Sequence, residues 1–346
     1  MPFEIAKHKA FLRENGIPRF LAEQYRPGIG SRQWKSQRHI VMYEGEPLPF
    51  DVVGSTKSGG FGSIDKVRDL VDDKFYAIKR PRRNRKYETD QLKNEAKLLE
   101  GLAATDHVVQ LVAIYERGEV YGIILEPYAE GTLADLLDQN APGINTTLSA
   151  GSFGCLSLGL SLIHEKRIRH KDVKPENVLY DASGRFLWAD FGLAYGFGQD
   201  AQSQTNNPPG AFSDAYAASE ILVTRVLRVG LSLIRVGHGR SADVFSLGCV
   251  FIRILVALIG TNGADDLHIH PFRKNKAIRP WVARQLNGSV EEHLRPVLQL
   301  AFDMAERNPI KRPDMPTVLR RLAQVPQSRL FNGCDQIVNE ILGRSS

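Results

Sequence analysis

The sequence predicts an α+β protein of two lobes, in which a small antiparallel β-sheet lobe with one main helix precedes a larger helical lobe. Strand patterns dominate up to Leu125, and helical patterns dominate after Pro127. The length of 346 residues suits either two domains or one bilobal domain. The composition, 42% hydrophobic and 24% charged, is ordinary for a soluble globular chain.

The first lobe is predicted from short apolar runs bounded by glycine and charged turns. One helical pattern, Thr89–Leu102, lies among them. The expected strands are Phe50–Val53, Phe61–Val67, Lys74–Lys79, Val108–Tyr115 and Val120–Leu125. Residues 1–49 read as an N-terminal extension, with a short helix near Ile5–Arg13 followed by irregular chain.

The second lobe is predicted from apolar residues at helical spacing. The expected helices are Thr132–Gln139, Thr147–Lys166, Ala242–Ile259, Val290–Glu306 and Met315–Leu322. A strand pair, Val178–Asp181 and Arg185–Ala189, fits around the turn at Ser183-Gly184. We expect a folded domain over residues 50–325, with lobes 50–126 and 129–325 and a C-terminal tail, 326–346.

Bulk properties favour a cytoplasmic or nuclear protein. Three widely spaced cysteines indicate free thiols in a reducing compartment, and the charged N-terminus lacks a secretory pattern. The apolar run Val244–Gly260 is shorter than a membrane span and contains Arg253, so we expect a buried core helix and no membrane association. The net charge of +6 is mild, and we expect no nucleic-acid partner. The basic run Lys79–Lys86 is interpreted as a solvated loop rather than a localisation signal.

The most informative segment runs from His170 to Asn177 and is followed by Asp190-Phe191-Gly192. Carboxylate and amide oxygens are the ligands that Mg²⁺ prefers, and a further carboxylate can orient an attacking hydroxyl. Phosphoryl transfer from a metal nucleotide needs such positioning and charge neutralisation more than covalent chemistry. The order D-x-x-x-x-N followed by D-F-G therefore predicts that reaction.

With these motifs the chain resembles eukaryotic-type protein kinases over roughly Phe50 to Val325. The resemblance implies that Asp172 is the catalytic base, that Lys174 contacts the γ-phosphate, and that Asn177 and Asp190 hold Mg²⁺ beside ATP. Lysine two positions after the aspartate resembles the serine/threonine-specific members. The implied partner is a protein with an acceptor serine or threonine.

In the first lobe, Tyr76-Ala-Ile-Lys79 resembles the strand whose lysine pairs with the ATP phosphates. Glu95 is the preferred partner for Lys79, with Glu88 and Glu100 as alternatives. The glycine-rich turn implies contacts from Gly59 and Gly62 to the phosphates. By resemblance, the Glu126 carbonyl and the Tyr128 amide contact adenine, Leu125 is the gatekeeper, and three apolar residues sandwich the base. These three are Ile64, Ala77 and Leu179.

The resemblance also implies structural anchors for the catalytic loop. Ser213 falls where serine/threonine kinases carry a hydroxyl that contacts this loop. Glu220 would pair with Arg312, and Asp243 would hold the loop backbone from the core helix. His170 is interpreted as a packing residue against Phe191. The chain departs from the family pattern at three positions, Lys57 for the first glycine, Lys171 for arginine and Ser219 for proline.

The segment Val223–Arg240 is longer than the family's connection, and it contains four arginines and no acid. It is either a partner-binding element, an extra strand or, as we hypothesise, in part a retained intron. Transcript reads that encode the whole segment would refute the intron hypothesis.

Two other function classes stay open beside the kinase. A pseudokinase scaffold is favoured by Lys57, Ser219 and the long segment. A small-molecule phosphotransferase also uses a loop aspartate and asparagine but lacks the later anchors.

Overall fold

The computed structural model describes residues 39–42, 50–59, 62–69, 73–82, 86–138, 151–197, 214–221, 239–259, 271–288 and 290–325, and the single positions 338 and 343. The chain divides into two compact units. Unit 1 contains residues 1–104 and 109–129, and unit 2 contains residues 105–108 and 130–346. The expected helix near Ile5–Arg13 and most of Val223–Arg240 lie outside the described residues.

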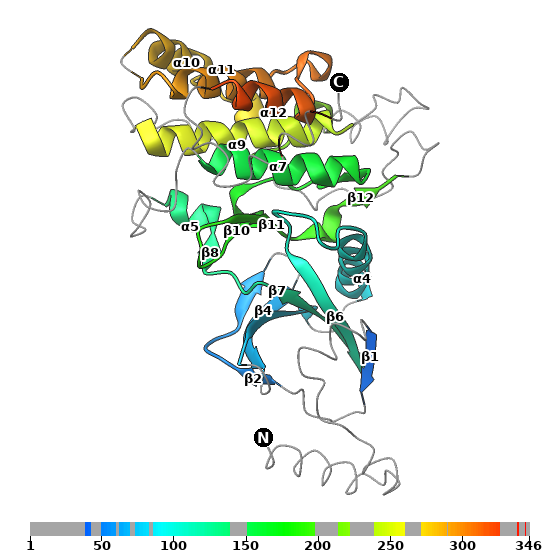
Figure 1. Ribbon diagram of the computed structural model, residues 1–346. Helices are drawn as coiled ribbons and strands as arrows, with labels where there is room; N and C mark the ends of the chain where they lie inside the picture. Colours follow the sequence, from blue (N-terminus) through cyan, green and yellow to red (C-terminus); the bar gives the residue numbers. More distant parts are fainter. Residues whose placement is uncertain are drawn as a thin grey trace, which may run out of the picture. The chain divides into compact units, whose positions relative to one another are not determined.

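Unit 1 is a mixed sheet with one long helix (Figure 1). The strands run in the spatial order β1-β6-β7-β5-β4-β2, and β3 pairs with β4. Their bounds are β1 His39–Met42, β2 Phe50–Val52, β3 Lys57–Gly59, β4 Gly62–Asp69, β5 Phe75–Arg80, β6 Gln110–Arg117 and β7 Val120–Glu126. The helix is α4, Lys86–Gly101. The five strands and the helix expected here are all present, with ends shifted by up to three residues.

The strand β1 corrects the interpretation of residues 1–49 as irregular chain after a short helix. It pairs in parallel with β6, with Ile40 opposite Tyr115, so the sheet is not wholly antiparallel. Ile40 is buried in a cluster that includes Tyr76, Ile78 and Ile124. Burial of this one side chain against the sheet explains why so short a segment forms a strand.

Unit 2 is mostly helical and is built around α9, Ser241–Ile259 (Figure 1). The other helices are α5 Leu133–Leu137, α7 Gly151–Glu165, α10 Ile278–Asn287, α11 Leu294–Met304 and α12 Met315–Ala323. Short strands and 3₁₀ turns connect them: β8 Gly131–Thr132, β9 Ile168–Arg169, η2 Pro175–Asn177, β10 Val178–Tyr180, β11 Phe186–Trp188, η3 Phe191–Leu193, β12 Tyr195–Gly196, η5 Phe272–Lys274 and η6 Pro309–Lys311.

Helix α9 is apolar and long enough to pass a membrane-span test by composition, the one such helix among the described residues. It is 78% buried inside the protein, and Phe251 packs edge-on against Phe153 of α7 with ring centroids 4.8 Å apart. The prediction of a buried core helix over this run is therefore confirmed. Cys249 on α9 and Cys155 on α7 are buried free thiols.

Helix α10 was missed because its sequence carries Pro280 and a mostly polar face. Proline is tolerated in the first turn, where its missing N–H would have no intrahelical partner. Trp281 is fully buried, and Val282 beside it is buried as well. These two side chains hold α10 onto unit 2.

Candidate active site

In unit 1, Lys79 and Glu95 form a buried ion pair. The Lys79 Nζ atom lies 2.7 Å from Glu95 Oε2, and the two residues are 4% and 1% exposed. Lys79 is near the end of β5, and Glu95 is in the middle of α4. Of the three glutamates considered from sequence, Glu95 is the one that pairs with this lysine. A buried ammonium needs such a partner, so the pair fixes where α4 packs on the sheet.

The strand register places Lys79 on the face of the sheet opposite the main apolar cluster. Residues directly opposite each other on antiparallel strands point to the same face. Lys79 is opposite Ile64 on β4, and Ala77 is opposite Leu125 on β7. Their strand neighbours Tyr76 and Ile78 belong to the cluster on the other face. Ile64, Ala77 and Lys79, three of the unit 1 residues expected to contact adenine or phosphate, therefore share one face of the sheet.

The structure requires a glycine at position 62 of the glycine-rich turn, independently of any contact with phosphates. A Cβ atom on Gly62 would lie 2.3 Å from the carbonyl oxygen of Arg80 on the neighbouring strand, so no larger residue fits without moving β5. Gly59 is paired with Gly62 in the β3–β4 hairpin, and Lys57 is paired with Ile64. The tip of this turn lies outside the described residues.

The expected hinge follows β7. Glu126 is the last residue of that strand and pairs with Gln110 of β6. The ring of Tyr128 lies 4.6 Å from the ammonium of Lys66, a cation–π contact that fixes the aromatic side chain on unit 1. Leu179, the third residue expected at the adenine, belongs to unit 2, where β10 places it between Leu187 and Thr132.

In unit 2, the side chains of Asp172, Lys174 and Asn177 meet in the predicted catalytic loop. Asn177 Nδ2 donates to both the backbone oxygen and the Oδ2 atom of Asp172, each at 2.8 Å. Lys174 Nζ lies 2.6 Å from the same Oδ2 atom. Asp172 is 4% exposed, and these contacts hold its carboxylate in one orientation.

The backbone of this loop is anchored by Asp243 from α9. Asp243 Oδ1 accepts the N–H of Lys171 at 2.9 Å, and Oδ2 accepts the N–H of His170 at 2.9 Å. Oδ2 also lies 3.0 Å from Nε2 of His164 on α7. Burial alone would raise the pKa of the Asp243 carboxyl, but the hydrogen bond and charge of His164, with further contributions from His170 and Lys171, lower it. Asp243 therefore carries a buried negative charge that holds the loop.

His164 is a positioning residue that the sequence analysis missed. Its signal in the sequence is a lone histidine near the end of an apolar helix, six residues before His170. Such a residue usually packs in a core, and only the structure shows that its ring reaches Asp243.

His170 packs in the core of the loop. Its ring centroid lies 5.0 Å from that of Phe191 and 5.4 Å from that of Trp188. Nε2 is 3.0 Å from the carbonyl oxygen of Ala189, and burial lowers the pKa of the imidazole. A neutral ring that donates to a backbone carbonyl fits a packing role rather than proton transfer.

Asp190 has a left-handed backbone, with φ 60° and ψ 69°, immediately before the turn η3. This conformation is unfavourable for a residue other than glycine, and strained positions of this kind cluster at functional sites. Asp190 is half-buried.

Lys171 also has a positive φ, 66°, and lies in a cationic region. Burial, together with the nearby charge of Arg169, lowers the pKa of its ammonium to about 8. Arg169 itself is 3% exposed, and its guanidinium lies 5.8 Å from the centroid of the Tyr195 ring. A lysine here is therefore a weaker fixed charge than the arginine of the family pattern.

The segment 214–221 is held by two arginines. Arg312 binds Glu220 with both terminal nitrogens, at 2.5 and 3.0 Å, and Arg273 binds both carboxylate oxygens of Asp214 at 2.7 and 2.8 Å. The first pair was expected from sequence, and the second was not. Ser213, the expected contact to the catalytic loop, lies outside the described residues.

The donor set of unit 2 fits a hard divalent cation. Asn177 turns its amide nitrogen toward Asp172, which leaves its Oδ1 oxygen as the atom that could ligate a metal. The carboxylate of Asp190 could supply the second oxygen donor. Mg²⁺ typically takes one or two such protein ligands and completes its shell with water and phosphate. No group of three or more histidine, cysteine or acidic residues that could hold a metal occurs among the described residues.

Comparison with known proteins gives one family and several curated relatives. The family model of the protein kinase domain matches residues 51–322. Serine/threonine-protein kinase PEPKR2 of Arabidopsis thaliana is 27% identical over 205 residues, which cover 59% of this chain and 39% of the relative. Serine/threonine-protein kinase chk1 of Schizosaccharomyces pombe is 29% identical over 210 residues, covering 57% and 39%. Serine/threonine-protein kinase PrkC of Bacillus subtilis is 25% identical over 215 residues, covering 61% and 31%. The matches to these and two further curated relatives cover between 19% and 53% of the length of the relative.

Proposed function

Because this chain belongs to the protein kinase family, we propose that it transfers the γ-phosphate of ATP to serine or threonine hydroxyls of protein substrates. The observation that carries the proposal is the arrangement around Asp172. Its carboxylate is oriented by the Asn177 amide and the Lys174 ammonium, on a backbone that Asp243 anchors from α9. A scaffold has no need for an acid held in this way.

In this reaction Asp172 orients the substrate hydroxyl and accepts its proton. Lys174 contacts the transferred phosphoryl group in this proposal, and the position of its ammonium beside the Asp172 carboxylate supports that role. A positive charge there offsets the charge that develops on the phosphoryl oxygens. The lysine at this position supports a serine or threonine acceptor, as it resembles the pattern of those enzymes.

In unit 1, Lys79, oriented by Glu95, would bind the α- and β-phosphates of ATP, and the sheet face that carries Ile64 and Ala77 would receive adenine. In unit 2, Asn177 and Asp190 would hold Mg²⁺, which would supply neutralising charge to the phosphates.

The second candidate is a pseudokinase scaffold, and three departures from the family pattern favour it. Lys57 replaces the first glycine, Ser219 replaces the usual proline, and a long segment precedes Asp243. A scaffold of this kind binds nucleotide or protein partners with little or no transfer.

A phosphate-transfer assay separates the two candidates. Radiolabelled ATP and generic protein substrates would be incubated with the wild type, with Asp172→Asn and with Lys79→Met, and phosphoamino-acid analysis would identify the acceptor. We expect label on serine or threonine and a loss of roughly 10²–10⁴-fold in the Asp172→Asn rate. Asp303→Asn, the same change in a partly exposed ion pair on α11, is the matched control and should keep full activity.

Nucleotide binding completes the test, and a thermal-shift titration with ATP and Mg²⁺ measures it. Asp172→Asn should still bind, whereas Lys79→Met should bind more weakly because it loses a phosphate contact. Wild-type protein that binds nucleotide but transfers no label would instead establish the scaffold. Label on tyrosine alone would overturn the assigned acceptor.

A further inference from the structure

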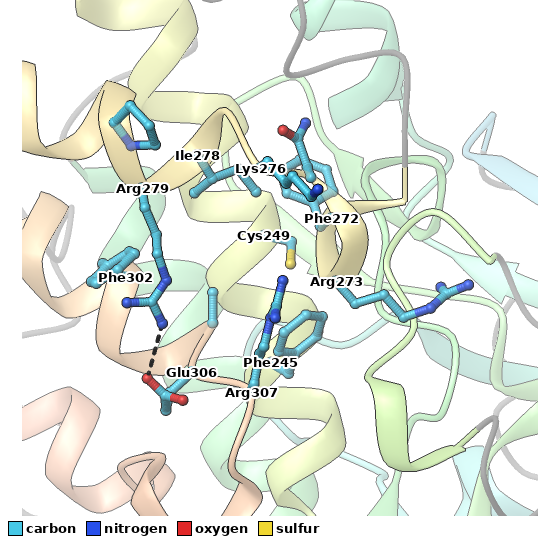
Figure 2. A pocket seen from close by; sticks show the side chains of 13 residues that line it. Phe245, Cys249, Phe272, Arg273, Lys276, Ile278, Arg279, Phe302, Glu306 and Arg307 are labelled. Carbon is cyan, nitrogen blue, oxygen red and sulfur yellow. Dashed lines mark ion pairs between the residues drawn. The ribbon is translucent and has the colours of Figure 1, made fainter.

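A pocket of about 380 Å³ lies in unit 2 between α9, the turn η5, the start of α10 and the end of α11 (Figure 2). It shares no residue with the catalytic loop or with the residues expected to bind ATP. Its volume is at the lower end of the range for ligand pockets and suits one bulky side chain. All thirteen lining residues belong to the part of unit 2 that the structure describes.

The floor of the pocket is apolar and preformed. Phe245 and Cys249 come from α9, and Phe272 comes from η5. All three are at most 6% exposed. Burial raises the pKa of the Cys249 thiol, so this cysteine acts as a small apolar surface rather than a nucleophile. An apolar group placed here would lose its contact with water against side chains that already have fixed positions.

The rim of the pocket is cationic. Lys276, Arg279 and Arg307 are exposed, and they lie on two walls of the pocket, since the first two precede or begin α10 and the third follows α11. Arg279 contacts the ring of Phe302 at 5.1 Å and the Glu306 carboxylate at 3.6 Å, as Figure 2 shows for the ion pair. Glu306 is the one acid among the lining residues, and Lys276 and Arg307 have no ion pair within the described chain.

We propose that this pocket docks an acidic peptide segment of a partner protein, which inserts one bulky apolar side chain onto the floor. Because the cations lie on two walls, they fit a peptide that crosses the mouth of the pocket with acidic residues on both sides of its apolar side chain. A ligand with a single carboxylate could contact the cations of only one wall. A central apolar anchor with charged flanks is also how energy is usually distributed in such interfaces. The docking does not require phosphoryl transfer, so a scaffold would retain it.

The pocket is connected to the segment 214–221 by shared side chains. Phe272 stacks on Tyr216 with ring centroids 5.4 Å apart, and its N–H donates to the carbonyl oxygen of Ala215. Arg273, another lining residue, is the arginine that binds Asp214. A docked peptide therefore contacts the same residues that hold this segment.

Fluorescence anisotropy with labelled synthetic peptides tests the proposal. The probe is a seven-residue peptide with a central tryptophan and three glutamates on each side. The full chain should bind it at least tenfold more tightly than two matched peptides, one with alanine in place of tryptophan and one with lysines in place of the glutamates. Equal binding of either matched peptide would overturn the proposal.

Charge changes on the protein locate the site. The double variant Lys276→Glu/Arg307→Glu should weaken binding of the acidic peptide by roughly tenfold, since two attractive contacts become repulsive. Glu306→Gln should strengthen it by a few-fold because the one opposing charge is removed. Lys97→Glu/Arg320→Glu, with the same change in net charge at exposed sites elsewhere, should leave the affinity unchanged.

Two further outcomes would reject the assignment. Equal loss of affinity in the two double variants would show that only net charge matters. Displacement of the peptide by dodecanoate at the concentration at which it is displaced by unlabelled peptide would show that the pocket takes a small amphiphile. If a variant fails to fold, the comparison among the three peptides on the wild-type chain still decides the question.

Discussion

The substitution Asp243→Asn isolates the contribution of the buried anchor beneath the catalytic loop. The carboxylate accepts the backbone N–H groups of His170 and Lys171 and contacts the His164 ring, all at 2.9–3.0 Å. An amide replaces one accepting oxygen by a donor, so at least one buried N–H loses its partner and the remaining bonds lose their charge. An unsatisfied buried donor costs about 1–3 kcal/mol, and charge-assisted bonds are worth about 1.5–3 kcal/mol each. We expect a loss of about 2–4 kcal/mol in the free energy of unfolding.

Urea unfolding followed by tryptophan fluorescence measures this loss, because Trp188 is fully buried and its ring lies 5.4 Å from that of His170. For a domain of this size, the change corresponds to a melting temperature lower by roughly 4–16 °C. Asp303→Asn is the matched control, since Asp303 pairs with Arg321 at a site where both side chains are about one-third exposed, and it should cost at most about 1 kcal/mol. Equal losses in the two variants, or a loss below about 0.5 kcal/mol for Asp243→Asn, would refute the reasoning.

The same anchor predicts a pH dependence. The pKa of the Asp243 carboxyl is lowered in the folded protein, so its contribution to stability is present above the unfolded value of about 3.9. That contribution disappears as the pH falls through the lower folded value. The difference in unfolding free energy between wild type and Asp243→Asn should therefore be constant near neutral pH and decrease below about pH 4.

Three other changes test further parts of the structure. Gly62→Ala should lower the free energy of unfolding by about 1–3 kcal/mol, because its Cβ atom would lie 2.3 Å from the Arg80 carbonyl oxygen. Gly101→Ala, whose Cβ atom would meet nothing within 4 Å, is the control and should be neutral or slightly stabilising. Equal effects of the two substitutions would contradict the strand contact. Lys171→Met should melt at a higher temperature than wild type near pH 7, because the wild-type ammonium is charged and buried there. This difference in melting temperature should shrink between about pH 8 and 10.4, where the wild-type lysine is neutral in the folded chain but still charged in the unfolded chain. A constant difference would show that the charge is not the cause. Arg312→Lys should lower the free energy of unfolding by about 1–3 kcal/mol, since an ammonium cannot form the bidentate pair, and an unchanged urea midpoint would argue against it.

Local patterns predicted the long elements well. Helix α9 was expected over Ala242–Ile259 and begins one residue earlier, because its apolar run and small residues leave no competing structure. Helix α12 was expected over Met315–Leu322 and ends one residue later, with Asp314 as its N-cap. Such elements carry their own start, stop and burial signals, so the chain itself specifies them.

Pairing over long sequence distances was harder to predict. The strand β1 forms by pairing with β6, whose residues lie 75 positions further along the chain, and its own four residues carry no recognisable strand pattern. The Arg273–Asp214 pair joins positions 59 apart, and a lone arginine in a turn looks like any solvated cation. The roles of Lys79, Asp172 and Asn177 were expected through motif order, while the contacts that hold them, above all the ring of His164, became visible only in the structure.

Arg312 has one further consequence for the chain. In addition to Glu220 it binds the carbonyl oxygen of Ser241 at 3.0 Å, so a single guanidinium ties together the two ends of the stretch between residues 220 and 241. When both ends of a loop are fixed, added residues cost only the slowly growing entropy of closing a longer loop. The fold therefore tolerates changes of length between residues 220 and 241. Residues can be gained, lost or exchanged there during evolution, or grafted there by design, with little effect on the structure of the catalytic loop.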